Sequence, residues 1–294
     1  MAYVTYVQEV AENAILLTHW GRMDQKPTSS SRYMADNWSA NWSPDTRAPS
    51  GKRWRFPGGS RKMIGEHPCY SPKKDIVIPV FSPPGYWSDT PWLSSWVPKR
   101  NTFAYFSGNL AQREPVKYAR GIRHRLRKAF IATPGWKLYG NRGNAYSRDL
   151  ARSEFCIVPP GGDGWSSRVD DAVRHGCIPV IIMDNVHMPF ESVLDYSSFA
   201  VRVPEADVER TDEILRNISI DKRERMREAM RRLWLRYTYA QAFLDAPNFL
   251  GGLPHDHLHD APLPALSSAV KPLGHGAPDA FDTLMMALHA RLGA

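Results

Sequence analysis

Cysteine is scarce in this sequence. Three occur among 294 residues, Cys69, Cys156 and Cys177. They are too few for a disulfide scaffold, and their spacing is not that of a zinc site. Cys156 and Cys177 lie in apolar, strand-like segments, where we expect buried, inert thiols.

Long apolar runs are absent as well. No stretch reaches the roughly 18 apolar residues that a membrane-spanning helix needs. The N-terminus also lacks the basic-then-apolar pattern of a signal peptide. We therefore expect neither a transmembrane nor a signal segment in this chain.

Acidic residues are outnumbered, since 38 Lys and Arg against 30 Asp and Glu give a net charge of +8. Such an excess attracts nucleic acid, anionic membranes or phosphorylated ligands. Much of it lies in segments 117–130 and 221–237, whose helical periodicity is typical of solvated helix faces. Neither segment carries aromatic stacking residues in a nucleic-acid-binding arrangement, so a nucleic-acid-binding protein is disfavoured.

The usual nucleotide-binding fingerprints are missing too. Neither a GxGxxG motif with a downstream ribose acid nor a Walker loop ending in Gly-Lys-Ser is present, which disfavours a Rossmann oxidoreductase. The histidines of "HDHLHD", His255, His257 and His259, alternate in a proline-flanked loop without fixed geometry. A solvated loop is the favoured interpretation, and we predict no metal site.

What the sequence does contain is an alternation of strands and helices. Apolar strands without polar alternation, joined through helices, predict an α/β fold with a doubly wound parallel sheet. We expect a strand at 13–20, then an irregular excursion to about residue 74, a regular domain over 75–249, and a Pro/Gly/His-rich loop with a C-terminal helix over 250–294. Within the domain, the expected strands are 75–81, 101–108, 135–140, 153–160, 177–183 and 198–205, and the expected helices 115–130, 144–152, 166–175, 206–217 and 221–243.

Three asparagines stand in glycosylation sequons. They are Asn37 in "NWSA", Asn41 in "NWSP" and Asn217 in "NIS". The sequons matter only if the chain enters the secretory lumen.

The most informative stretch is "PPGGDGWSSRVDDAV", residues 159–173, between an expected strand and helix. Glycines such as Gly164 let the backbone approach a ligand closely. Ser166 and Ser167 can cap the helix or donate to phosphate, and Arg168 supplies a planar, permanently charged group. Asp170 and Asp171 either complement the helix dipole or accept hydrogen bonds from ribose hydroxyls.

Residues 153–205, "SEFCIVPPGGDGWSSRVDDAVRHGCIPVIIMDNVHMPFESVLDYSSFAVRVPE", resemble the signature block of exostosin-like glycosyltransferases, in particular the plant and algal branch. The segments "HPCYSPKKDIVIPVFSPP", "RNTFAYFSGNLAQREPVKYARGIRHRLRKAF" and "ILLTHWGR" resemble preceding blocks of that family. The resemblance implies a GT-B fold with a Rossmann-like donor-binding domain. Since only about a dozen residues precede "ILLTHWGR", we expect a partial N-terminal, acceptor-side half.

The resemblance also implies roles for individual residues. Ser166, Ser167 and Arg168 match the phosphate-contacting loop, and Asp171 matches the ribose-binding carboxylate. Gly108 and Arg113 match a second loop that approaches the diphosphate. Glu191 begins the segment lining the sugar side, or alternatively forms a simple helix entry. His19 and Asp24 are the nearby candidates for the catalytic base, although for His19 a packed strand-end role is favoured.

By this resemblance the protein transfers a sugar, with inversion, from a UDP-sugar to an oligosaccharide or cell wall polysaccharide acceptor, without a cofactor. The family also implies a Golgi location and other glycosyltransferases as candidate partners. The alternative is a catalytically incomplete fragment that binds a nucleotide sugar without turnover.

Overall fold

The computed structural model describes most of the central chain. The described residues are 15, 17–19, 21–22, 72–73, 75–82, 90–92, 98–110, 118–141, 143, 145–161, 166–239 and 278–292. Among them, no helix combines the length and apolar character needed to cross a membrane.

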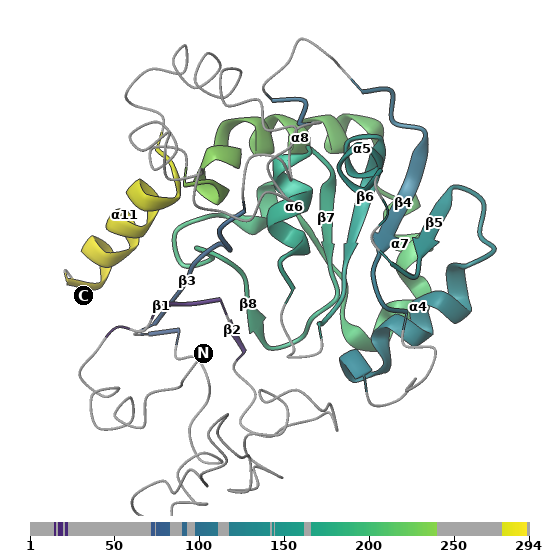
Figure 1. Cartoon of the computed structure of the whole chain (residues 1–294), viewed down its shortest axis with the longest axis horizontal. Coiled ribbons are helices and arrows are strands. Elements are labelled where there is room, and N and C mark those ends of the chain that lie inside the picture. Colours follow the sequence, from purple (N-terminus) through teal and green to yellow (C-terminus); the bar gives the residue numbers. More distant parts are fainter. Residues whose placement is uncertain are drawn as a thin grey trace, which may run out of the picture.

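A five-stranded parallel sheet forms the centre of the molecule (Figure 1). Its strands are β4 (Thr102–Ser107), β5 (Trp136–Tyr139), β6 (Ser153–Val158), β7 (Ile178–Ile181) and β9 (Val201–Arg202). They lie in the order β5-β4-β6-β7-β9, and every neighbouring pair is parallel. The predicted α/β fold with a doubly wound, Rossmann-like domain is confirmed.

Side chains of both faces of this sheet are buried, which explains the continuous apolar runs in the sequence. Along β4, Ala104 and Phe106 pack with Leu126 and Phe130 of α4 (Ile122–Phe130). Tyr105 points to the other face and packs in a second cluster. This cluster contains Leu150 of α5 (Tyr146–Ala151) and Ala172 of α6 (Arg168–Arg174).

Most of the remaining elements of the domain follow β7 in the chain. β8 (Val186–His187) and η3 (Tyr196–Ser198) precede β9, and η4 (Glu205–Arg210), α7 (Thr211–Arg216), α8 (Ile220–Leu233) and η5 (Trp234–Tyr237) follow it. Two other elements are η2 (Tyr118–Gly121), directly before α4, and α11 (Ala280–Leu292). The helices predicted at 144–152 and 166–175 are thus confirmed with slightly shorter bounds, and α11 is the predicted C-terminal helix.

The N-terminal strands lie beside the main sheet. β1 (Leu17–Thr18) pairs in parallel with β3 (Ile76–Val77), and β2 (Gly21–Arg22) pairs antiparallel with β8. Ile76 and Phe190 share a small buried cluster with α11, which lies at the side of the molecule away from β5 (Figure 1). The expected strand at 75–81 therefore pairs with β1.

Arg174 ties the segment after β3 to the domain. It is only 2% exposed. Its Nη1 donates to Ser82 Oγ at 3.0 Å and its Nη2 to the Val80 carbonyl at 3.1 Å, while Nε donates to the Tyr237 carbonyl at 3.1 Å. Because a buried guanidinium must satisfy its donors, these bonds fix the position of residues 80–82.

The prediction of inert thiols at Cys156 and Cys177 is wrong, because the two residues form a disulfide with their Cα atoms 5.7 Å apart. Cys156 lies on β6, and Cys177 immediately precedes β7. The parallel pairing of Phe155 with Ile178 brings the two side chains together. Sequence spacing alone does not reveal that adjacency.

Candidate functional site

The direction in which the chain adds strands changes at β4. From β4 the chain goes to β5 on one side, and from β5 it returns past β4 to β6 on the other side. The two connecting helices, α4 and α5, therefore pack on opposite faces of the sheet. In doubly wound sheets, ligands bind at the carboxyl ends of the strands at such a switch point. Here these ends are Ser107–Gly108 and the segment beginning at Pro159.

Arg168 spans this switch point. Its Nε and Nη2 both donate to the Ser107 carbonyl oxygen, at 3.1 and 3.0 Å. Its Nη1 donates to Ser166 Oγ at 3.3 Å, and its guanidinium carbon lies 5.0 Å from the centre of the Phe106 ring. The cation is thus fixed between the end of β4 and the loop that follows β6.

Gly108 leaves the space that Arg168 occupies. Its φ of +149° is one that side-chain-bearing residues rarely adopt, and a Cβ built there would overlap Arg168 Nη2. Two residues predicted from the sequence as diphosphate contacts are therefore neighbours, although they lie 60 positions apart in the chain.

Arg123 is a second guanidinium at the same place, and the sequence interpretation missed it. We expected segment 117–130 to be a solvated face, but Arg123 is only 3% exposed. Its Nε donates to the Pro160 carbonyl at 2.8 Å and its Nη1 to the Asn109 carbonyl at 3.1 Å. Arg123 thereby joins the loop after β4 to the loop after β6.

The two serines differ in burial. Ser166 is buried, and its Oγ accepts hydrogen bonds from both the backbone N–H and Nη1 of Arg168, at 3.5 and 3.3 Å. Ser167 is the N-cap residue of α6 and makes no side-chain capping bond. Of the two roles considered for these hydroxyls, helix capping is therefore not the one Ser167 performs.

Asp171 lies one turn further along α6. Its Oδ2 accepts a hydrogen bond of 2.9 Å from the Tyr146 hydroxyl, and its Oδ1 lies 3.6 Å from Arg174 Nη1. The carboxylate is thus held by a phenol from α5 and a cation from its own helix.

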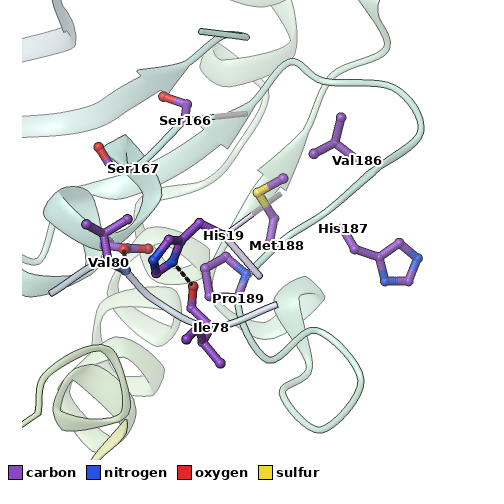
Figure 2. A pocket seen from close by; sticks show the side chains of 10 residues that line it. His19, Ile78, Val80, Ser166, Ser167, Val186, His187, Met188 and Pro189 are labelled. Atoms are coloured by element: carbon purple, nitrogen blue, oxygen red, sulfur yellow. Dashed lines mark hydrogen bonds between the residues drawn. The ribbon is translucent and has the colours of Figure 1, made fainter. Parts of the chain in front are cut away.

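A small pocket opens between the N-terminal segments and the domain (Figure 2). Its polar lining residues come from both parts. His19 follows β1, Ser166, Ser167 and Asp170 come from the start of α6, and His187 comes from β8. His19 Nδ1 lies 3.0 Å from the Ile78 carbonyl oxygen, while the His187 ring points away from His19 (Figure 2).

Asp170 is the most perturbed carboxyl of the pocket. Its Oδ2 accepts a 2.9 Å hydrogen bond from the Val80 N–H, while its Oδ1 is buried without a hydrogen-bond partner among the described residues. Burial raises the pKa of Asp170 to about 7, although Arg174 and the Val80 N–H oppose the shift. Desolvation likewise lowers the pKa of His187. Asp170 is therefore a group of this pocket that can exchange a proton near neutral pH.

Glu191 has two structural contacts. One carboxylate oxygen accepts from the Met188 N–H at 2.7 Å, and the other pairs with Arg202. Met188 and Pro189 line the pocket directly, whereas Glu191 closes the turn that presents them. Glu191 thus closes a turn, and the helix-entry alternative is wrong, because residues 189–193 form turns and no helix begins there.

Several predicted residues lie outside the described part of the chain. These are Arg113, Gly164, Asp24, the sequons at Asn37 and Asn41, and the histidines at 255, 257 and 259. Within the described residues, no group of three or more His, Cys, Asp or Glu side chains is arranged to hold a metal ion.

Known proteins resemble this chain over about half of its length. A probable glucuronosyltransferase of Oryza sativa subsp. japonica is 36% identical over 165 residues, which are 53% of this chain and 36% of the relative. A probable β-1,4-xylosyltransferase of Arabidopsis thaliana is 34% identical over 156 residues, 52% of this chain and 37% of the relative. The chain thus matches little more than a third of the length of these relatives.

A solved structure and a family model match this chain as well. A glycosyltransferase from Rickettsia africae ESF-5 aligns with a TM-score of 0.37 and 12% identity, covering 63% of this chain and 59% of that one, a likeness too distant to add to the assignment. The model described as "Exostosin GT47 domain" matches residues 27–218, more than half of the chain. It covers the switch point, the pocket lining after residue 27 and all five strands of the sheet, and the protein accordingly belongs to the exostosin GT47 domain family.

Proposed function

We propose that this protein is an inverting glycosyltransferase of the GT-B type. It takes a sugar from a UDP-sugar and transfers it to an oligosaccharide or polysaccharide acceptor, such as a cell wall glycan, in the Golgi lumen. Family membership supports the reaction class. The names of the relatives make UDP-glucuronate and UDP-xylose the first donors to test.

The observation that carries the proposal is the position of Arg168. A diphosphate needs fixed positive charge where the strands end, and Arg168 is held there by Ser107 and Ser166. A phosphate oxygen approaching Nη1 would also meet the Ser166 hydroxyl. Charge-assisted hydrogen bonds of this kind are about twice as strong as neutral ones.

The reaction places its main electrostatic demand on the leaving group. The acceptor oxygen attacks the anomeric carbon as the bond from that carbon to the diphosphate breaks, so negative charge grows on the departing UDP. A guanidinium that is already oriented stabilises this charge without reorganising during the step. Arg168 performs this role, and the glycine at position 108 leaves the space that its guanidinium needs. No cofactor other than the donor substrate enters this scheme.

Two further residues complete the proposed donor site. Ser167 supplies a hydroxyl to the diphosphate, since it is not engaged in capping α6. Asp171, held by Tyr146, accepts hydrogen bonds from the ribose. The base that takes the acceptor proton stays open, with His19 as the candidate that lines the pocket.

Calorimetric titration with UDP tests the donor site. Arg168→Ala is expected to weaken UDP binding by about 1.5–3 kcal/mol, the range for hydrogen bonds to charged groups. Arg232→Ala is the matched control, because Arg232 is an exposed guanidinium on α8 that pairs with Glu228. Equal UDP affinity of a folded Arg168→Ala protein and the control would refute the donor site.

Release of UDP from UDP-sugars tests the reaction itself. Acceptor-dependent UDP release supports glycosyl transfer. Binding of UDP without turnover, across a panel of oligosaccharide acceptors, would instead support the alternative, a chain that binds a nucleotide sugar without catalysis.

A further inference from the structure

Asn217 lies on the turn between α7 and α8, and its side chain is exposed. Its backbone N–H closes the last turn of α7 by donating to the Glu213 carbonyl at 3.2 Å. The neighbours Arg216 and Ile220 are exposed as well, Ile220 to 71%. A large group attached to Asn217 would therefore project into solvent without disturbing the core.

The residues after Asn217 complete an acceptor sequence. Ile218 separates Asn217 from Ser219, and neither Ile218 nor Ile220 is a proline. The Asn-X-Ser pattern is the substrate of N-linked glycosylation. In the folded chain, Ser219 is the N-cap of α8, and its Oγ accepts from the Lys222 N–H at 3.2 Å.

An independent observation concerns the compartment. Cys156 and Cys177 form a disulfide although both are buried in the sheet and shielded from solvent oxidants. Structural disulfides form and persist in the secretory lumen and are rare in the cytosol. The same lumen contains the machinery that glycosylates exposed sequons. The disulfide therefore indicates that the Asn217 sequon is exposed to the glycosylation machinery of that lumen.

The turn that carries Asn217 lies near the amino ends of the strands, opposite the carboxyl ends that form the switch point. The Arg216 guanidinium lies 4.5 Å from the ring centre of Phe103 and reaches toward the Pro134 carbonyl. Phe103 is the second residue of β4, whereas Arg168 binds Ser107 at the end of that strand. Phe103 and Ser107 are four residue steps of about 3.3 Å apart, a distance on the order of 13 Å. A glycan on Asn217 would thus leave the proposed donor site open.

We propose that Asn217 carries an N-linked glycan. In the attachment step, Asn217 Nδ2 forms a bond to the first sugar carbon of a lipid-linked diphosphate oligosaccharide. The bond from that carbon to the phosphate oxygen breaks, the lipid diphosphate leaves, and Nδ2 loses one proton. The proposal does not depend on the identity of the transferase reaction.

The experiment directs the full chain into the endoplasmic reticulum of a eukaryotic host and maps its peptides by mass spectrometry. A peptide-N-glycosidase removes the glycan and converts the glycosylated asparagine to aspartate, so Asn217 should read as aspartate after treatment. Asn217→Gln should abolish that signal and leave any signal from Asn37 or Asn41 in place.

Two variants of Ser219 separate glycosylation from helix capping. Ser219→Thr keeps both the sequon and a capping hydroxyl, so the glycan should remain. Ser219→Asn keeps a good N-cap but destroys the sequon, so the glycan should disappear while the fold is retained. UDP affinity should be the same in wild type and Asn217→Gln.

Disulfide mapping of the same sample provides the internal reference. An unmodified Asn217 in protein whose Cys156–Cys177 bond has formed would overturn the proposal. Free thiols at both cysteines in protein isolated from the cells that make it would remove the premise and overturn it equally.

Discussion

Arg168 and Gly108 are matched to each other. The Arg168 guanidinium occupies the space that a side chain at residue 108 would fill, and it binds the carbonyl of the preceding residue, Ser107. Because Gly108, which directly follows β4, has no Cβ, the Arg168 guanidinium can lie against the end of that strand. This pair connects the two loops that the doubly wound topology brings together.

Gly108→Ala is predicted to disrupt this arrangement. The added methyl would displace Arg168, and the positive φ would be strained, at a cost of about 1–3 kcal/mol in the free energy of unfolding. UDP binding should fall together with stability. The measurements are urea denaturation and calorimetry. Gly140→Ala is the control, because no atom lies within 4 Å of a Cβ built at that glycine after β5, and it should change neither quantity by as much.

Arg123→Ala is predicted to weaken the connection between the loops that follow β4 and β6. The substitution leaves the buried Pro160 carbonyl without its donor and removes a hydrogen bond to the Asn109 carbonyl, which should lower the free energy of unfolding by about 1–3 kcal/mol. Hydrogen exchange should quicken in the loops after β4 and β6. Lys128→Ala, an exposed change on the same helix, is the reference. Equal unfolding free energies of the two variants would show that Arg123 has no such role.

The disulfide is predicted to stabilise the fold by limiting the unfolded chain. Cys156 and Cys177 are separated by 21 positions, and a closed loop of that size is worth about 3 kcal/mol. The double variant Cys156→Ala, Cys177→Ala should unfold at correspondingly lower denaturant. Thiol titration of the unfolded wild type should gain two thiols on reduction. A double variant as stable as oxidised wild type would contradict this prediction.

The sequence predicted the elements of the fold better than the contacts between them. Apolar runs such as that of β6 are visible because both faces of the sheet are buried, and the strand-loop-helix order identifies the carboxyl edge. Those signals place the loop after residue 158 at the carboxyl ends of the strands, whereas it was the family resemblance that implied a common site for Gly108 and Arg168.

What the sequence did not reveal depends on which strands are neighbours. Cys156 meets Cys177 only because β6 pairs with β7 in a particular register, and Arg123 reaches two carbonyls only because β4 lies beside β6. The helical period of segment 117–130 identifies a polar face but not the loops that this face meets. A basic helix therefore looked solvated although one of its arginines is buried.

Asp170 is predicted to make stability depend on pH. Its pKa in the folded protein is about 7, above the roughly 3.9 of an unfolded aspartate, so between these values the folded state binds more protons. The free energy of unfolding should therefore fall as pH rises from about 4 to about 7 and level off above that. At 1.36 kcal/mol per pKa unit, the loss is as much as about 4 kcal/mol.

Asp170→Asn tests this dependence, because an amide oxygen can still accept the Val80 N–H but cannot ionise. Chemical denaturation across pH 4–8 should show that the free energy of unfolding of the variant increases relative to that of wild type between about pH 4 and 7. The difference should remain constant above that range. Asp221→Asn, an exposed change in the first turn of α8, should follow the wild-type curve. If the curves of wild type and Asp170→Asn ran parallel throughout, Asp170 would already be ionised in the folded protein, and a cation facing its buried Oδ1 would have to be sought.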